Sequence, residues 1–134
     1  MSTRQTITIF SALLTVLALS TTLSGFVTPV SAQGGSNVSI VLGADTMADK
    51  AFSPNPMNVK VEDTVTWTND DSQAHTVTSG NSSDPDKGKV FDSSPNFNPL
   101  LAPKQTFQHK FITAGDFPYF CQLHPTMIGK VVVS

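Results

Sequence analysis

A thiol, an imidazole and a thioether lie within seven residues near the C-terminal end of the sequence, as Cys121, His124 and Met127. Thiolate and thioether are soft metal ligands and imidazole is intermediate, a donor set that suits copper cycling between its +1 and +2 states. A zinc site would usually recruit further Cys, His or carboxylate side chains and would not select methionine. The spacing of these three side chains on one loop therefore predicts a copper site.

A fourth ligand must come from another part of the chain, and His75 is the candidate. It follows a turn-like stretch, residues 70–74, and begins an alternating run in which it shares parity with Val77. We therefore expect its side chain to point inward at one end of the strands. Two His, one Cys and a weakly bound axial Met make the trigonal geometry of a blue (type-1) copper site.

The segments that must position these ligands alternate between apolar and polar residues with a period of two. Each run is short, rich in Val, Thr and aromatic residues, and separated from the next by turn residues. We therefore expect an all-β fold, an antiparallel sandwich of six to eight short strands. Residues 44–52 could add one short helical turn. The expected strands lie around residues 38–40, 57–61, 65–68, 75–79, 107–111, 117–121 and 131–133.

The same segments resemble the cupredoxin family, specifically its plastocyanin and amicyanin branch. The resemblance is carried by V-E-D-T-V-T-W-T-N-D-D at 61–71, A-H-T-V-T-S at 74–79 and G-D-F-P-Y-F-C-Q-L-H-P-T-M-I-G-K-V-V-V at 115–133. The Cys-x-x-His-x-x-Met spacing is that of the short amicyanin ligand loop. The resemblance implies a cupredoxin-like fold, a Greek-key antiparallel β-sandwich of about seven to eight strands with one copper ion at one end. It also implies one-electron transfer between redox partners. Many relatives carry Asn after the first histidine ligand, where this chain has Thr76.

The N-terminal segment predicts export from the cytoplasm. Arg4 is the one charged side chain before Asp45, and residues 7–19 are mostly apolar. This pattern is typical of a secretory signal peptide over residues 1–32, which leaves residues 33–134 as a plastocyanin-like copper-binding domain. The alternative is an uncleaved membrane anchor, because the uncharged stretch is long enough to span a bilayer. Both readings place the copper domain in a periplasm, at a cell surface or in the medium.

The bulk composition excludes several classes of protein. Charged residues are 13% of the chain and the net charge is −2, so the basic face that a nucleic-acid binder needs is missing. A hydrophobic content of 39% suffices for a packed core but not for a protein with several membrane spans. Cys121 is the single cysteine, so no internal disulfide can form. An enzyme is not expected, because a single blue copper centre has no open coordination position.

We expect the protein to shuttle single electrons by Cu(I)/Cu(II) cycling as an exported blue copper protein. It should act as a monomer whose redox partners dock transiently near His124, Leu123 and Pro125. One alternative is an extracytoplasmic module that stores or delivers copper without carrying electrons. A second alternative is an adhesion sandwich that holds no metal.

A few other residues resemble functional ones without fitting the copper constellation. His109 lies well inside an expected strand and is expected to be a semi-buried structural histidine. Met47 and Met57 are expected to be packing or loop residues rather than ligands of a second copper. Asn37 and Asn81 begin glycosylation sequons, which matter only if the host glycosylates exported proteins.

Overall fold

Short strands whose side chains alternate between core and solvent build residues 35–134, the part of the chain that the computed structural model describes. In Thr64–Asn69, for example, every second residue is buried. The short helical turn allowed by the sequence is present as two turns of 3₁₀ helix. The strands are β1 Ser36–Ile40, β2 Phe52–Ser53, β3 Met57–Val59, β4 Thr64–Asn69, β5 Thr78–Ser79, β6 Thr106–Lys110, β7 Gly115–Phe120 and β8 Ile128–Val133; the 3₁₀ helices are η1 Ala44–Thr46, η2 Ala48–Lys50 and η3 Pro95–Phe97.

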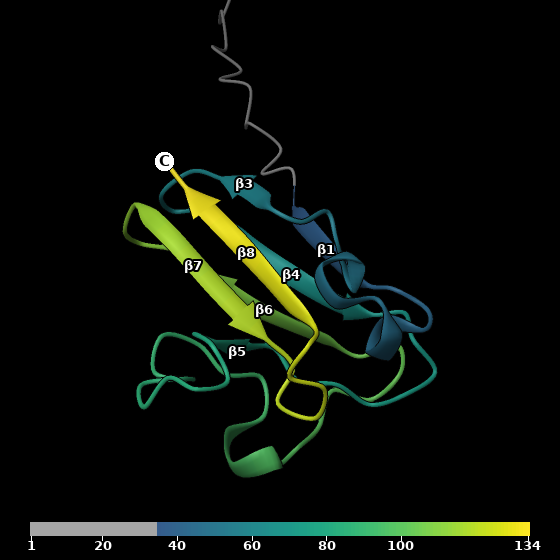
Figure 1. Ribbon diagram of the computed structural model, residues 1–134. Coiled ribbons are helices and arrows are strands. Elements are labelled where there is room, and N and C mark those ends of the chain that lie inside the picture. Colours follow the sequence, from purple (N-terminus) through teal and green to yellow (C-terminus); the bar gives the residue numbers. More distant parts are fainter. Residues whose placement is uncertain (1–34) are drawn as a thin grey trace, which may run out of the picture. The chain divides into compact units, whose positions relative to one another are not determined.

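The strands form two four-stranded sheets, one with the order β2-β1-β4-β6 and the other with the order β3-β8-β7-β5. Figure 1 shows them as two layers, with β7 and β8 in front of β4 and β6. The predicted all-β sandwich is therefore confirmed. Each sheet also contains one parallel pair, β1 with β4 and β3 with β8, so the sheets are mixed rather than antiparallel throughout. Strand direction depends on where the long connections return the chain, which local alternation does not encode.

The core between the sheets is filled by aromatic side chains from both layers. The ring of Trp67 on β4 meets that of Tyr119 on β7 edge-on, with centroids 5.5 Å apart. Tyr119 in turn lies across Gly129 on β8, where a Cβ atom would fall 2.3 Å from the Tyr119 ring. Glycine is therefore required at position 129 for β7 and β8 to pair at this register.

The strand expected over residues 75–79 is shorter than predicted. Only β5 at its end is a strand, paired with β7. His75 instead forms an isolated bridge with Leu101, with N–O distances of 3.1 and 3.0 Å between the two backbones. The partner of this stretch is the proline-containing segment 91–101, which is too irregular to continue a ladder. The bridge nevertheless fixes His75 at one end of the sandwich.

The signal peptide or anchor predicted over residues 1–32 lies outside the described residues. Within residues 35–134, no helix is both long enough and apolar enough to cross a bilayer. The two sequon residues, Asn37 and Asn81, both have exposed side chains.

Candidate metal centre

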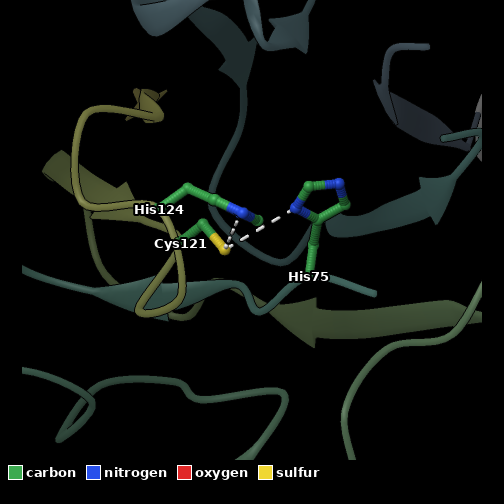
Figure 2. Close-up of side chains that lie close together, drawn as sticks. All are labelled: His75, Cys121 and His124. Atoms are coloured by element: carbon green, nitrogen blue, oxygen red, sulfur yellow. Dashed lines mark hydrogen bonds between the residues drawn. The ribbon is translucent and has the colours of Figure 1, made fainter. Parts of the chain in front are cut away.

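Three potential ligand atoms converge at one end of the sandwich. The sulfur of Cys121 lies 3.7 Å from Nδ1 of His75 and 3.8 Å from Nδ1 of His124. Ligand atoms of all three residues lie within 4.8 Å of one another. Figure 2 shows His75 reaching the sulfur from a separate segment, while His124 and Cys121 share one loop. The structure thus brings together three of the four residues that the sequence singled out.

The fourth residue, Met127, is fully buried at the end of the same loop. The loop turns twice, since the N–H of His124 donates to the carbonyl of Cys121 at 3.2 Å and the N–H of Met127 donates to that of His124 at 2.8 Å. The N–H of Cys121 then donates back to the carbonyl of Met127 at 3.1 Å. These bonds close a compact loop between β7 and β8 that holds the thioether inside the protein.

Asp71 holds the far nitrogen of His75. Its Oδ2 lies 2.8 Å from Nε2 of His75, and both side chains are buried. Its other oxygen accepts hydrogen bonds from the backbone N–H groups of Gly43 at 3.0 Å and Ser72 at 2.7 Å. Because a carboxylate only accepts, a neutral His75 donates from Nε2 and keeps the lone pair of Nδ1 directed at Cys121. This is the tautomer and ring orientation that a metal ligand needs.

The electrostatics of the group favour a thiolate. Burial would raise the pKa of the Cys121 thiol, but hydrogen bonds with His75, the Thr76 N–H and His124 lower it to about 6. Burial likewise opposes the charged form of His75, yet Cys121 and Asp71 together raise its pKa. The pKa of Asp71 is lowered to about 2, because backbone N–H groups and His75 outweigh its burial. A thiolate at neutral pH is the form that binds metals.

Thr76 joins the two ligand segments. Its N–H donates to the sulfur of Cys121 at 3.3 Å, and its hydroxyl oxygen accepts the N–H of Gln122 at 2.8 Å. Thr76 therefore ties the His75 segment to the Cys121 loop through its hydroxyl group. No local pattern predicts this contact, because Thr76 and Gln122 lie 46 residues apart in the chain.

Two contacts of the site were missed from the sequence. The sequence predicts Asp71 only as part of a turn, although an acidic residue four positions before a candidate ligand is a usable signal. The bonds made by Thr76 carry no such signal. His109, by contrast, packs between aromatic rings, 5.0 Å from Phe91 and 4.8 Å from Phe111 by ring centroids, and is partly buried as expected. Its pKa is lowered by that burial.

The donor set fits copper. A lowered-pKa thiol faces two imidazoles, and a thioether lies in the same loop. These are the soft and intermediate donors that copper prefers. Among residues 35–134, the carboxylate that bonds to the group is that of Asp71, and it contacts Nε2 of His75 rather than the nitrogen that faces Cys121. His124 is the partly exposed member of the group, whereas His75 and Cys121 are buried.

Comparisons with known proteins agree with this geometry. Residues 38–134 match the family model of copper binding proteins of the plastocyanin/azurin family. A chloroplastic plastocyanin of Tetradesmus obliquus is 33% identical, with 99% of this chain and 90% of the relative covered. Amicyanin-alpha of Methylorubrum extorquens is 34% identical, with 66% of this chain and 68% of the relative covered.

A solved structure, the novel purple cupredoxin from Nitrosopumilus maritimus, matches the fold with a TM-score of 0.58 and 31% identity. The match covers 74% of this chain and 99% of that one. Copper is therefore the cofactor, as the sequence predicted, and the chain is a metal-binding protein rather than an enzyme. On its sequence, its two-sheet fold and its His-Cys-His group, the chain belongs to the plastocyanin/azurin family of copper-binding proteins and is a cupredoxin.

Proposed function

We propose that this protein is an exported blue copper electron carrier with His75, Cys121, His124 and Met127 as the ligands of one copper ion. The observation that carries the proposal is the convergence of one thiol and two imidazoles within 4.8 Å at one end of the sandwich. When bound, copper supplies one-electron chemistry by cycling between +1 and +2. The protein supplies the fixed ligands around it.

Hydrogen bonds to His75 and Cys121 constrain the positions of these two ligand residues in the metal-free protein. Asp71 fixes the ring of His75, and the backbone bridge to Leu101 fixes its main chain. The N–H of Thr76 holds the sulfur of Cys121 from the opposite segment. A site whose ligands are already constrained by packing and hydrogen bonds rearranges little when its charge changes. Small rearrangement is the condition for fast electron exchange.

His124 is the proposed port for electrons, because it is the partly exposed member of a group whose other members are buried. Its neighbours Leu123 and Pro125 are exposed, and Phe97, 52% exposed, lines the same hollow as Pro125. A small apolar surface of this kind favours brief docking over stable assembly. We therefore propose that redox partners dock around Leu123, His124 and Pro125, and that the protein works as a monomer.

Export is proposed from the N-terminal pattern alone. Residues 1–32 would act as a cleaved signal peptide or as a retained anchor, with the copper domain outside the cytoplasm in either case. Cell fractionation of the full chain and of a chain lacking residues 1–32 tests this. Copper protein that stays in the cytoplasm with the segment intact would refute export.

The electron-carrier function is tested by spectroscopy and electrochemistry of the copper-loaded protein. We expect an intense visible absorption, a narrow copper hyperfine splitting in EPR, and reversible exchange of one electron with a soluble mediator. Cys121→Ser should lose all three. Slow or irreversible exchange, together with ready transfer of copper to a chelating acceptor, would instead support storage or delivery. A protein that stays colourless after loading would contradict both readings.

A further inference from the structure

Behind the ligand segments lies a hydrogen-bonded set of four polar side chains, which we call the threonine–aspartate network: Thr76, Thr78, Asp92 and Gln122. The hydroxyls of Thr76 and Thr78 are 3.1 Å apart, and the Thr78 hydroxyl is 3.1 Å from Oδ1 of Asp92. Nε2 of Gln122 donates to the Thr78 oxygen at 2.9 Å and to Oδ2 of Asp92 at 3.3 Å. Both threonines are buried, so the bond between their hydroxyls is not easily replaced by water.

The Asp92 carboxylate determines the direction of every bond in the network. Because a carboxylate only accepts, Thr78 must donate its single hydroxyl proton to Asp92. The Thr78 oxygen then has only lone pairs to offer, so the Thr76 hydroxyl must donate to it. The Thr76 oxygen is left as an acceptor, and it receives the N–H of Gln122 at 2.8 Å. Each proton therefore has one position.

Two members of the network, Thr76 and Gln122, connect it to the Cys121 sulfur. Thr76 donates its N–H to the sulfur of Cys121 at 3.3 Å, and Gln122 is the next residue after Cys121. Thr78 itself has no hydrogen bond to His75, Cys121 or His124 in the part of the chain described. Its hydroxyl is, however, the centre of the network, with three bonds to the other three members.

We propose that Thr78, oriented by Asp92, is a positioning residue for the Cys121 sulfur. Its hydroxyl fixes the rotation of the Thr76 side chain, whose oxygen holds the N–H of Gln122. That tie between the two backbone segments sets the distance between the Thr76 N–H and the sulfur of Cys121. A hydrogen bond to the thiolate withdraws electron density from it and stabilises the reduced, less positive metal. Loss of the Thr78 hydroxyl therefore weakens that bond and lowers the midpoint potential. The inference rests on the proposed copper site.

Thr78→Val is the direct test, because valine keeps the shape of threonine and changes no charge. In the metal-free protein, we expect amide hydrogen exchange at Gln122 to become roughly fivefold to tenfold faster, the factor that corresponds to loss of the one hydrogen bond that its N–H makes to the Thr76 oxygen. In the copper-loaded protein, we expect a lower midpoint potential and a shifted visible band. Thr78→Ser keeps the hydroxyl and should restore both readouts towards wild type.

Thr68→Val is the matched control. Thr68 is a partly buried threonine on β4 whose hydroxyl has no hydrogen-bond partner among residues 35–134. In the Thr68→Val protein, the Gln122 exchange rate and the midpoint potential should therefore stay at wild-type values. A Thr78→Val protein that is less stable but keeps the wild-type Gln122 exchange rate and potential would overturn the inference. It would show that the network is only packing.

A second variant serves if Thr78→Val does not fold. Asp92→Ala removes both carboxylate oxygens, and with them the acceptor that orients the Thr78 hydroxyl. Unchanged exchange at Gln122 in this variant would also overturn the inference. The exchange measurement needs no metal, so a wild-type protein that never turns blue refutes the proposed function. A blue wild type with an unaltered Thr78→Val refutes only the network's role.

Discussion

Nε2 of His75 lies 2.8 Å from Oδ2 of Asp71, in a pair whose side chains are 0% and 1% exposed. The bond connects a proposed ligand to a carboxylate that also receives the backbone N–H groups of Gly43 and Ser72. Asp71 thus connects the His75 ring to the backbone at Gly43 and at Ser72. Its removal should affect both the stability of the domain and the binding of the metal.

Asp71→Ala should destabilise the metal-free protein by about 3 to 5 kcal/mol, because each buried donor left without an acceptor costs about 1 to 3 kcal/mol. It leaves the Nε2–H of His75 and two backbone N–H groups without acceptors. Copper affinity should fall by about 10- to 100-fold, as for other groups that orient a metal-bound histidine. Urea unfolding and competition titration measure the two effects.

Asp70→Asn is the control for that prediction. Asp70 neighbours Asp71 but is exposed and pairs with Lys104 at the surface. Exposed pairs contribute about 1 kcal/mol or less, so this variant should remain close to wild type. Equal effects of the Asp70 and Asp71 variants would contradict a specific role for the buried carboxylate.

The stability of the metal-free protein should fall in acid because of Asp71. Its folded-state pKa is about 2, below the ordinary value of 3.8, because backbone N–H groups and His75 outweigh burial. The contribution of the carboxylate is therefore fully present above pH 3.8 and is lost as the pH falls through about 2. Unfolding measured across this window should show a shallower loss of stability in Asp71→Asn than in wild type. Identical slopes would show that the acid loss comes from other groups.

Copper uptake should depend on pH through Cys121. Its pKa is about 6, so above that pH the thiolate already predominates. Below pH 6, binding must displace a proton, and the apparent copper affinity should fall about tenfold per pH unit from this group alone. Competition titrations from pH 8 to pH 4 with a chelator of known proton affinity check this. The proton from the thiol should appear only below about pH 6, in addition to the one that His75, whose pKa is raised, releases. Proton release of the same size at pH 8 would show that the thiol is not preionised.

Gly129→Ala should destabilise the sandwich by about 1 to 3 kcal/mol, as overpacking of a filled core does. The added Cβ would lie 2.3 Å from Cζ of Tyr119, whose ring is buried against Trp67 and Phe52 and has no room to retreat. Gly35→Ala is the control, because a Cβ there meets nothing closer than 3.7 Å. Urea unfolding of the two variants should separate them clearly, and equal midpoints would mean that the Tyr119 ring shifts at little cost.

A charge beside His124 should slow electron exchange between two copies of the protein. Leu123→Glu places a carboxylate on the proposed docking surface, so two approaching copies repel each other there. The self-exchange rate, measured by NMR line broadening in a mixture of oxidised and reduced protein, should fall by roughly tenfold or more. Ile112→Glu changes an apolar residue that is 68% exposed and follows the far end of β6, and it should have little effect. If both variants slow exchange equally, the docking surface is not at Leu123.

The sequence alone determined the features that depend on neighbours in the chain. Cys121, His124 and Met127 lie on one loop, so their spacing identified the copper chemistry without knowledge of the fold. The alternation in runs such as Thr64–Asn69 likewise fixed the all-β class, because side chains of a strand point to opposite faces in turn. The parity of His75 with Val77 likewise indicated the fourth ligand, whereas the Greek-key arrangement came from the resemblance to cupredoxins.

Only the tertiary structure decided the contacts between distant segments. The parallel pairing of β1 with β4 depends on how the chain returns between the sheets. The bond from Gln122 to Thr76 joins residues that no local pattern connects. The same holds for Asp71, which looks like a turn residue until Gly43 and His75 are brought to its two oxygens. Ligand identity is local chemistry and can be read along the chain, whereas ligand positioning is a set of hydrogen bonds that exist only once the two sheets have closed.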